Sequence, residues 1–544
     1  MSTPVTEWLP GMDITAGRLQ YMLEHLAEAQ SVTATGAIGD GSTDDAPAIQ
    51  TALTAARDAG GGWIVVPPGT YLLASLPLRI YRNTRLTLLP GAEFRRGATG
   101  QLMINGDTGQ SFGGWGGHSN ITVEGGLWNM RGGEVAYAAD SMCMSFGHCA
   151  DITIRDLEIR DVAGLHAVEL NSTKRATVQN CVFRGYNDPT GTRDFSEAVQ
   201  LDLAKGSSYF GAFGPYDNTP CEDVSMKGCY VGASGSAGTT AWPRGIGSHS
   251  ATITKYHRRI KVLACSFEGT LQYAVSAYNW EDAVVSSCNF QSCGSGVRLR
   301  SVISSDTEDT KLPDGTQTSA SQTMRGAVVT GNTFRDGGSY DHAILAYGEQ
   351  TGPVLNATIS GNTIDSTATG ESGIRVVWAS RATVTWNTIN NVGSTAISTD
   401  SMTQCNVSDN VIYNPTDHGI TVLNSVWTNV ADNNVRECGG NGLLVQSGAD
   451  IHLRNNFIKA PSRSANGGFY GIRISTSSSS ITLAGNKCRP FGSGNEASHG
   501  CSIATGTTLV HRYGNDWRGA TWVTATYAEG TGTNSINSAT DLIA

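Results

Sequence analysis

The sequence predicts an all-β solenoid, a parallel β-helix formed by a single chain. Short segments of one type recur along it, among them "DITIRDLEIRD", "ATVQNCVFRG", "AVVTGNTFRD", "ATISGNTIDS" and "NVADNNVREC". Each combines an alternating apolar strand with a turn that contains Gly or Asn. The most regular copies, from Ala357 to Asp450, return about every 21 to 25 residues. This period indicates stacked coils, and the apolar spacing of three and four that marks helical repeats is absent.

A second set of strands lies between these segments, including "HAVELN", "EAVQLD", "YAVSAY", "SGVRLR" and "HAILAY". A single coil cannot bury its apolar face alone, so we expect stacking of the coils to supply the core.

Composition narrows the function classes. The chain of 544 residues has 66 Gly, only 15% charged residues and a net charge of −10. No run rich in Lys and Arg appears, so nucleic acid is not an expected partner. No apolar stretch reaches the roughly 18 residues needed for a membrane span. The N-terminus also lacks the basic and then apolar pattern of a secretory signal.

Cysteine and asparagine occupy one repeated position. Cys181, Cys229, Cys265 and Cys288 hold the same place in successive repeats, and Asn332, Asn362, Asn387 and Asn410 follow them there. Stacked coils would bring equivalent side chains to about 4.8 Å from one another. We therefore predict an internal asparagine ladder, with the cysteines as small buried apolar groups rather than disulfides or metal ligands. Reduced cysteines fit folding in an intracellular compartment.

The sequence predicts four regions in the chain. Residues 1–33 form an attachment region with an amphipathic helix over 13–30, and residues 34–100 cap the β-helix. Residues 101–505 form the coils, and 506–544 form a second cap or an oligomer contact. Within the first cap, Asp45 and Pro47 are expected to start a helix that ends at Gly60 to Gly62.

The first cap also shows a family resemblance. "GDGSTDDAPAIQTAL…GGWIVVPPGTYLL" resembles the opening of pectate-lyase-superfamily right-handed parallel β-helix proteins, which include phage tailspikes and capsule depolymerases. The resemblance implies a right-handed solenoid and a homotrimer that binds or cleaves a bacterial polysaccharide. It also implies N-terminal attachment to a phage tail and location in the virion after folding in the host cytoplasm, or else an extracellular location.

No cofactor is expected. Asp40, Asp44 and Asp45 could suggest a metal site, but the resemblance and the start of the helix favour a structural cap. Calcium-dependent pectate lyases use a carboxylate cluster on the sheet face, and only isolated acids occur here, so calcium is the less favoured alternative.

Long insertions interrupt the coils in one region. They cover residues 186–196, 204–222, 231–245 and 303–324. Loops on neighbouring coils of a rigid scaffold can wall a groove, so we expect a binding groove beside them.

The outward face of the second strands carries the candidate chemistry. One column runs through Glu169, Gln200, Gly247, Ser276, Arg298, Leu345 and Arg375, and the next through Asn171, Asp202, His249, Tyr278, Arg300, Tyr347 and Val377. Strand geometry places the α-carbons of Glu169 and Asp202 about 8 Å apart. Paired carboxyls suit glycoside hydrolysis, in which one protonates the leaving oxygen and the other activates water or attacks carbon. Glu197 or Asp194 is an alternative to Glu169 as the second acid.

A polysaccharide lyase is the main enzymatic alternative. His249 or Tyr278 would move the proton, while Arg298, Arg300 or Gln200 would pair with a uronate. Trp242, Trp280, Tyr256 and Tyr273 are candidate platforms for sugar rings. A non-catalytic glycan-binding adhesin or structural tail protein, and a sugar epimerase, also remain open.

Overall fold

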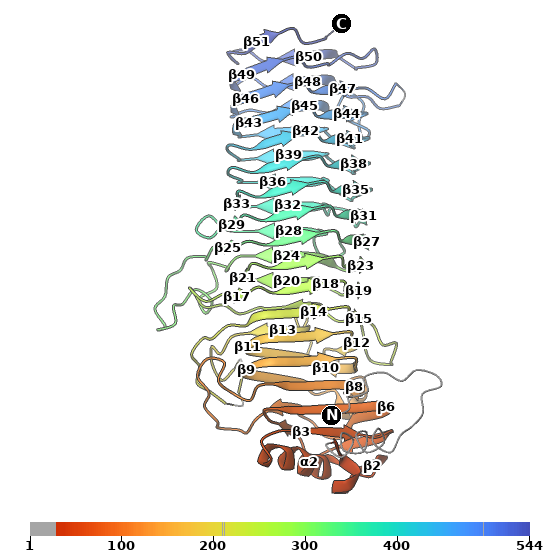
Figure 1. The fold of residues 1–544 in the computed structure, drawn as a ribbon. Coiled ribbons are helices and arrows are strands. Elements are labelled where there is room, and N and C mark those ends of the chain that lie inside the picture. The colour runs from red at the N-terminus through yellow and green to blue at the C-terminus, as the bar shows by residue number, and fades with distance from the viewer. Residues whose placement is uncertain (1–28, 209, 212, 493, 544) are drawn as a thin grey trace, which may run out of the picture.

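The computed structural model describes residues 29–208, 210–211, 213–492 and 494–543, and it is a parallel β-helix (Figure 1). Every ladder between its named strands is parallel, from β1–β3 at one end to β49–β51 at the other. The coils stack in chain order from the N-terminal cap to the C-terminal end. The all-β solenoid predicted from the repeats is confirmed.

The N-terminal cap consists of a short strand and one helix. β1 (Ala29–Ser31) pairs with β3 (Gly62–Val66), and α2 (Ala46–Asp58) buries Ile49 and Leu53 against the first coils. The helix predicted over 13–30 lies outside the described residues as far as residue 28. Its last two positions, Ala29 and Gln30, instead begin β1, so the predicted end of that helix is wrong.

The start of α2 differs from the prediction in one detail. The carboxylate of Asp44, not Asp45, accepts the amide of Ala46 at 3.2 Å, and Pro47 occupies the first turn as expected. Asp45 turns back and accepts the amides of Ile38 and Gly39. The two acids therefore tie the loop before the helix to the helix start, which is the structural role expected for this acidic cluster.

The strands predicted to carry the site form one continuous sheet. They are β9 (Met144–Arg155), β11 (Val168–Gln179), β13 (Glu197–Asp202), β16 (Arg244–Gly247), β20 (Tyr273–Tyr278), β24 (Ser295–Arg300), β28 (Ile344–Tyr347) and β32 (Ile374–Val377). Inward apolar residues such as Val199 and Leu201 are fully buried and belong to a single core that runs the length of the stack.

The asparagine ladder is present. Asn387 Nδ2 donates to Asn410 Oδ1 at 3.0 Å, and the same contact repeats from Asn332 through Asn515 to Asp541. The cysteines precede this ladder in the same column, where Cys288 donates its amide to Asn332 Oδ1. All 12 cysteines are buried and free, so their predicted role as packing groups is confirmed.

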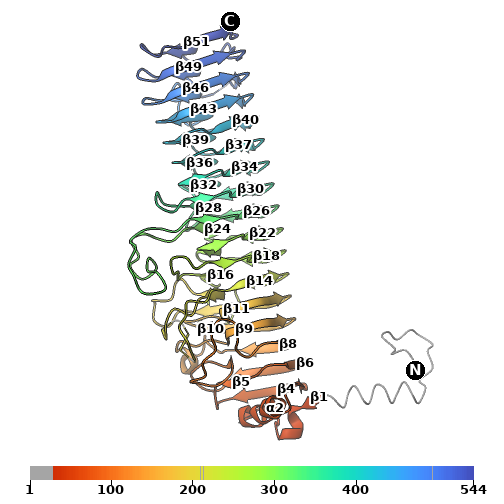
Figure 2. The same ribbon diagram turned by 60° about the vertical axis from the view of Figure 1, so that its left-hand side comes forward.

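The long insertions separate strands of the middle coils. They lie between β12 (Val182–Asn187) and β13, between β13 and β14 (Glu222–Lys227), between β15 (Tyr230–Gly232) and β16, and between β24 and β25 (Met324–Arg325). Figure 2 shows the long loops gathered on one side of the N-terminal half of the solenoid. This side carries the cavities described below.

The C-terminal segment continues the coils instead of leaving them. β49 (Thr508–Tyr513), β50 (Ala525–Glu529) and β51 (Ile536–Ala539) add parallel strands to the stack. The predicted boundary at 505 is therefore too early, because polar residues obscure the pattern there. Among the described residues, no helix is long and apolar enough to cross a membrane.

Candidate active site

The register of the sheet brings together the first predicted column. Gln200 lies opposite Glu169 on one side and Gly247 on the other, and Arg298 lies between Ser276 and Leu345. In the second column Asp202 lies opposite Asn171, and Arg300 lies between Tyr278 and Tyr347. His249 lies two residues beyond the end of β16 and lines the same cavity as Gln200 and Asp202. The alignment made from the sequence is confirmed for every paired position, and the position of His249 is not tested by a strand pairing.

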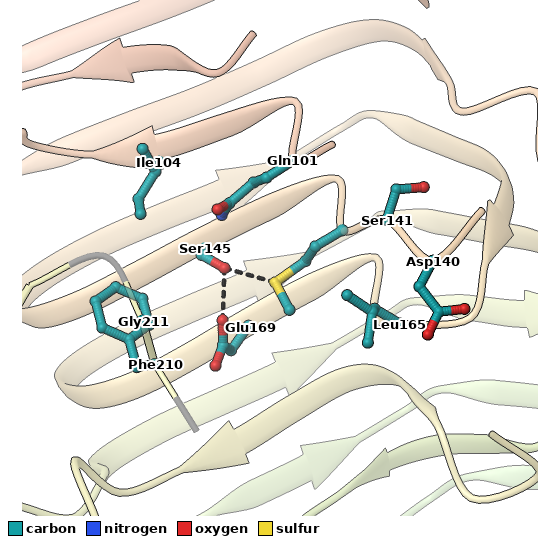
Figure 3. Close-up of a pocket in the computed structure, with 10 residues that line it drawn as sticks. Gln101, Ile104, Asp140, Ser141, Ser145, Leu165, Glu169, Phe210 and Gly211 are labelled. Carbon is teal, nitrogen blue, oxygen red and sulfur yellow. Dashed lines mark hydrogen bonds between the residues drawn. The ribbon is translucent and has the colours of Figure 1, made fainter. Parts of the chain in front are cut away.

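Three cavities follow one another along this face. The central one, about 400 Å³, is lined by Glu169, Gln200, Asp202 and His249 together with loop residues such as Phe195. Glu169 also lines a smaller cavity of about 180 Å³ on its other side (Figure 3). The third, about 400 Å³, lies beyond His249 toward Arg298. Residues from the insertions line all three cavities, as expected for a groove walled by loops.

Glu169 is held in a protonated state. It is 3% exposed, and burial, with a smaller contribution from the charge of Asp202, raises its pKa to about 8. Ser145 Oγ lies 2.5 Å from both Glu169 Oε2 and Met142 Sδ, the two contacts drawn in Figure 3. A hydroxyl has one proton to give. If Ser145 donates it to the sulfur, a protonated Glu169 completes the chain by donating to Ser145.

Asp202 is a carboxyl of lower pKa in the same cavity. Burial raises its pKa to about 6, and the neighbouring His249 limits the rise. It accepts hydrogen bonds from Gln200 Nε2 at 3.0 Å, from the amide of Leu203 at 2.8 Å and from the hydroxyl of Ser250. Near neutral pH, Asp202 is therefore mostly ionised while Glu169 keeps its proton. Their environments separate the two pKa values, so that Glu169 is suited to act as an acid and Asp202 as a base.

Glu197 contacts two side chains of the site without lining a cavity itself. Its side chain is fully buried, 3.3 Å from Arg244 Nη1 and 3.2 Å from His249 Nδ1. Burial would raise its pKa, but the charges of His249 and Arg244 hold it at about 2. Glu197 and Asp202 in turn raise the pKa of His249, although burial opposes this. The prediction of Glu197 as a catalytic acid is corrected: it lines none of the three cavities and positions His249.

A third column was missed in the sequence. His166, Glu197, Arg244, Tyr273, Ser295 and His342 each stand two residues before the first inward Val or Ile of their strand. Alternation places them on the core side, yet His166 lines the central cavity and Arg244 lines the third. His166, 3% exposed with its pKa lowered to about 4 by burial, stacks on His249. Polar residues at an inward position were the available signal.

The two candidate arginines have different surroundings. Arg300 forms an ion pair with Glu349 at 2.6 Å and lies over Tyr347. Arg298 donates to Ser276 Oγ at 2.7 Å and lies 4.4 Å from the ring centroid of Tyr273. Arg300 is therefore already neutralised, whereas Arg298 faces the third cavity.

The tryptophans predicted as sugar platforms are not exposed. Trp242 and Trp280 each have no exposed surface, and Trp280 Nε1 donates to Ser248 Oγ at 2.7 Å. This prediction is corrected, since both rings pack in the solenoid core.

Tyr278 lines the third cavity, but its hydroxyl donates to Asp309 at 2.8 Å. Burial, and then the charge of Asp309, raise the pKa of Tyr278 well above the usual range. Asp194 lines the same cavity.

One group in the described part of the chain has ligands close enough for a metal ion. It comprises Asp341, His342 and Glu371, beside β28 and β32. Glu371 Oε2 lies 2.7 Å from His342 Nδ1, and Arg375 Nη1 lies 3.3 Å from His342 Nε2. A carboxylate and a guanidinium thus already flank the two ring nitrogens, and the cationic Arg375 disfavours a metal ion there.

Two family models match different parts of the chain. One, described as "Rhamnogalacturonase A/epimerase, pectate lyase-like", covers residues 29–298, and the other, "Right handed beta helix region", covers 315–488. Together they confirm the predicted handedness and the resemblance drawn from the first cap.

Known proteins with this fold differ in their described roles. The chain is 26% identical over 284 residues to plasmin and fibronectin-binding protein A of Streptococcus pneumoniae, covering 48% of this chain and 39% of that protein. The solved structure of this surface adhesin, PfbA, covers 84% of this chain and 92% of its own, with a TM-score of 0.52 and 19% identity.

Mannuronan C5-epimerase AlgE1 of Azotobacter vinelandii is 31% identical over 160 residues, covering 26% of this chain and 11% of the epimerase. The tailspike of E. coli bacteriophage HK620, solved with a pentasaccharide, is 12% identical with a TM-score of 0.47, covering 95% and 82% of the two chains. The aligned segments span well under half of the two curated relatives, the adhesin and the epimerase.

Proposed function

We propose that this pectate-lyase-like right-handed parallel β-helix protein binds a bacterial surface polysaccharide in its loop-walled groove and hydrolyses a glycosidic bond there. The observation that supports this most directly is the carboxyl pair on adjacent strands. Glu169 and Asp202 line one cavity of about 400 Å³, and their pKa values lie at about 8 and about 6. Paired carboxyls with separated pKa values are what acid-assisted glycoside cleavage requires.

The roles follow from the protonation states. Glu169 donates its proton to the glycosidic oxygen as the bond to the anomeric carbon breaks. Asp202, ionised, either removes a proton from the attacking water or attacks the anomeric carbon itself. His249 lies between Glu197 and Asp202, and its positive charge keeps Asp202 ionised. Gln200 Nε2 donates a hydrogen bond of 3.0 Å to one carboxylate oxygen of Asp202. Proton transfer by placed carboxyls contributes roughly 100-fold to 10,000-fold to such reactions.

Elimination has weaker support in this geometry. A lyase needs a base for the C5 proton and a cation at the same uronate. Tyr278 is a poor base because its hydroxyl is bound to Asp309 and its pKa is raised. Arg300 is already paired with Glu349. His249 remains the one candidate base of the lyase hypothesis that lines the central cavity.

The proposed setting is a phage tailspike or minor tail protein, acting as a homotrimer attached through its N-terminal region, or a protein that acts outside the cell. A non-catalytic adhesin is the second candidate. It is favoured by the similarity to a streptococcal surface adhesin whose name describes plasmin and fibronectin binding.

Incubation with purified bacterial surface glycans tests these alternatives. New reducing ends support hydrolysis, and an unsaturated uronate product supports elimination. Retained glycan binding without either product supports the adhesin.

A further inference from the structure

Two tryptophans are exposed at bends between strands of the C-terminal half. The side chains of Trp386 and Trp427 are 67% and 58% exposed. Both backbones are left-handed, with φ values of 59° and 52°. At the bend of Trp386, the coil before carries Gly361 and the coil after carries Asp409. A bulky side chain in this conformation costs free energy, so its presence at an exposed position points to a function.

The two residues border a ladder of short strands, which Figure 2 shows on the side of the solenoid away from the long loops. The strands are β22 (Val284–Ser286), β26 (Val328–Thr330), β30 (Thr358–Ser360), β34 (Thr383–Thr385), β37 (Asn406–Ser408) and β40 (Asn429–Ala431). Trp386 directly follows β34, and Trp427 lies two residues before β40. They therefore stand at opposite ends of these strands.

This ladder presents a face without charge. In each of the six strands the middle residue is buried in the core, so alternation turns the first and last residues outward. Those outward residues are all Val, Ser, Thr, Asn or Ala, and together they form what we call the uncharged face. The described ladder continues into Lys261 on one side and into His452 and Arg454 on the other. Six strands about 4.8 Å apart make this face about 24 Å long.

Hydrogen bonds between neighbouring strands order the polar side chains of the uncharged face. The hydroxyls of Thr385 and Ser408 lie 3.2 Å apart, and Asn429 Nδ2 donates to Asn406 Oδ1 at 2.8 Å. These groups keep further capacity to donate and accept hydrogen bonds. A linear polymer along the stack would meet hydroxyl and amide groups at successive coils, in positions that are fixed before it binds.

We propose that the uncharged face is a binding site for an uncharged polysaccharide, with Trp386 and Trp427 as contact surfaces for its sugar rings. An indole offers a flat apolar surface to the C–H face of a sugar, and Ser, Thr and Asn side chains match the sugar hydroxyls. Charge favours this partner over others. An anionic polymer or lipid surface needs cations, which the outward residues of the six strands lack, and a second copy of this chain carries the same net charge of −10.

The site is independent of the proposed hydrolase. Glu169 and Asp202 lie on the ladder of β11 and β13, whereas the uncharged face lies on the ladder that runs through β34. The inference therefore goes beyond cleavage, because this second site would hold the protein on a glycan whether or not the groove cleaves one.

The test is affinity electrophoresis of the full chain in native gels that contain a β-glucan, an arabinoxylan, a galactomannan or an α-glucan, with alginate as the anionic comparison. We expect at least one uncharged polysaccharide to retard the protein, and alginate to retard it less. The double variant Trp386→Asn and Trp427→Asn should weaken this binding roughly tenfold or more, because both ring contacts are lost.

Trp378→Asn is the matched control. Trp378 has the same left-handed backbone, with φ of 49°, but it precedes β33 (Ala379–Ser380), outside the uncharged face. This variant should bind like the wild type. Because Asn suits a left-handed backbone and both replaced indoles are largely exposed, the double variant should keep or exceed the wild-type Tm.

Each contrary result would overturn the site. These results are retardation by none of the four uncharged polysaccharides, stronger retardation by alginate, binding unchanged in the double variant, and equal loss of binding in Trp378→Asn. A lower Tm in the double variant would mean that the two rings serve the fold, and would contradict the site as well. None of these readouts depends on cleavage, so a failure of the proposed hydrolase would leave the site standing.

Discussion

Replacing Glu169 by Gln should abolish cleavage and at the same time stabilise the protein above neutral pH. Folding holds the proton on Glu169, so its pKa rises from 4.5 to about 8. The unfolded chain loses this proton near pH 4.5, whereas the folded chain keeps it until about pH 8. Stability linked to this group is therefore full below pH 4.5 and is lost as the pH rises toward 8.

The size of the effect follows from the same shift. Between pH 5 and pH 7.5 the wild type should lose about 3 kcal/mol of unfolding free energy through Glu169. A glutamine has no proton to lose, so Glu169→Gln avoids this loss. For a chain of 544 residues, 3 kcal/mol corresponds to roughly 2 to 3 °C in Tm.

The assay is differential scanning fluorimetry of both proteins over this pH range. Scan rates are matched because many large proteins unfold irreversibly and their apparent Tm then depends on scan rate. The gap in Tm between variant and wild type should widen steadily from pH 5 to pH 7.5, while reducing-end release by the variant stays at background. A gap that is constant with pH would refute a raised pKa for Glu169. Cleavage by the variant at the wild-type rate would refute its role as the acid.

The remaining predictions concern the other groups of the site and the scaffold. The pH profile of kcat/KM should be bell-shaped, rising near pH 6 as Asp202 ionises and falling near pH 8 as Glu169 loses its proton. A profile that lacks one of these two limbs would contradict the roles assigned to Asp202 and Glu169. Glu197→Gln should shift the acidic limb to higher pH, because a less charged His249 no longer lowers the pKa of Asp202, and a purely structural role would leave that limb in place. Asn433→Ala removes donors to Asn456 Oδ1 and to a buried carbonyl, and should lower Tm by roughly 2 to 4 °C; an unchanged Tm would contradict the ladder's contribution. Cleavage should survive a chelator such as EDTA, since the proposed steps use carboxyls alone, and activity restored only by added metal would contradict them.

Much of the sheet could be predicted because its rule is simple. Apolar residues such as Val199 and Leu201 point inward, and their equivalents do so in every coil. Because side chains alternate along a strand, these inward positions determine which side chains share the outer face and which residues of neighbouring strands pair. The asparagine ladder was predictable for the same reason, since one position of the repeat changes from Cys to Asn and then keeps Asn.

The errors have two different sources. Glu197 has the same inward parity as Val199 and Leu201 and is fully buried, so alternation itself argues against a place on the outward face. Its partners Arg244 and His249 come from the next coil. Trp242 and Trp280 lie in or beside irregular segments. Sequence alone does not decide whether an aromatic ring there faces the groove or the core, and the structure buries both.

The most direct measurement for the proposed hydrolase is the product released from an acidic bacterial surface polysaccharide. Hydrolysis by Glu169 and Asp202 predicts new reducing ends without the ultraviolet absorbance of an unsaturated uronate, and predicts their loss in both Asp202→Asn and Glu169→Gln. An unsaturated product from the wild type, or undiminished cleavage by both variants, would contradict it.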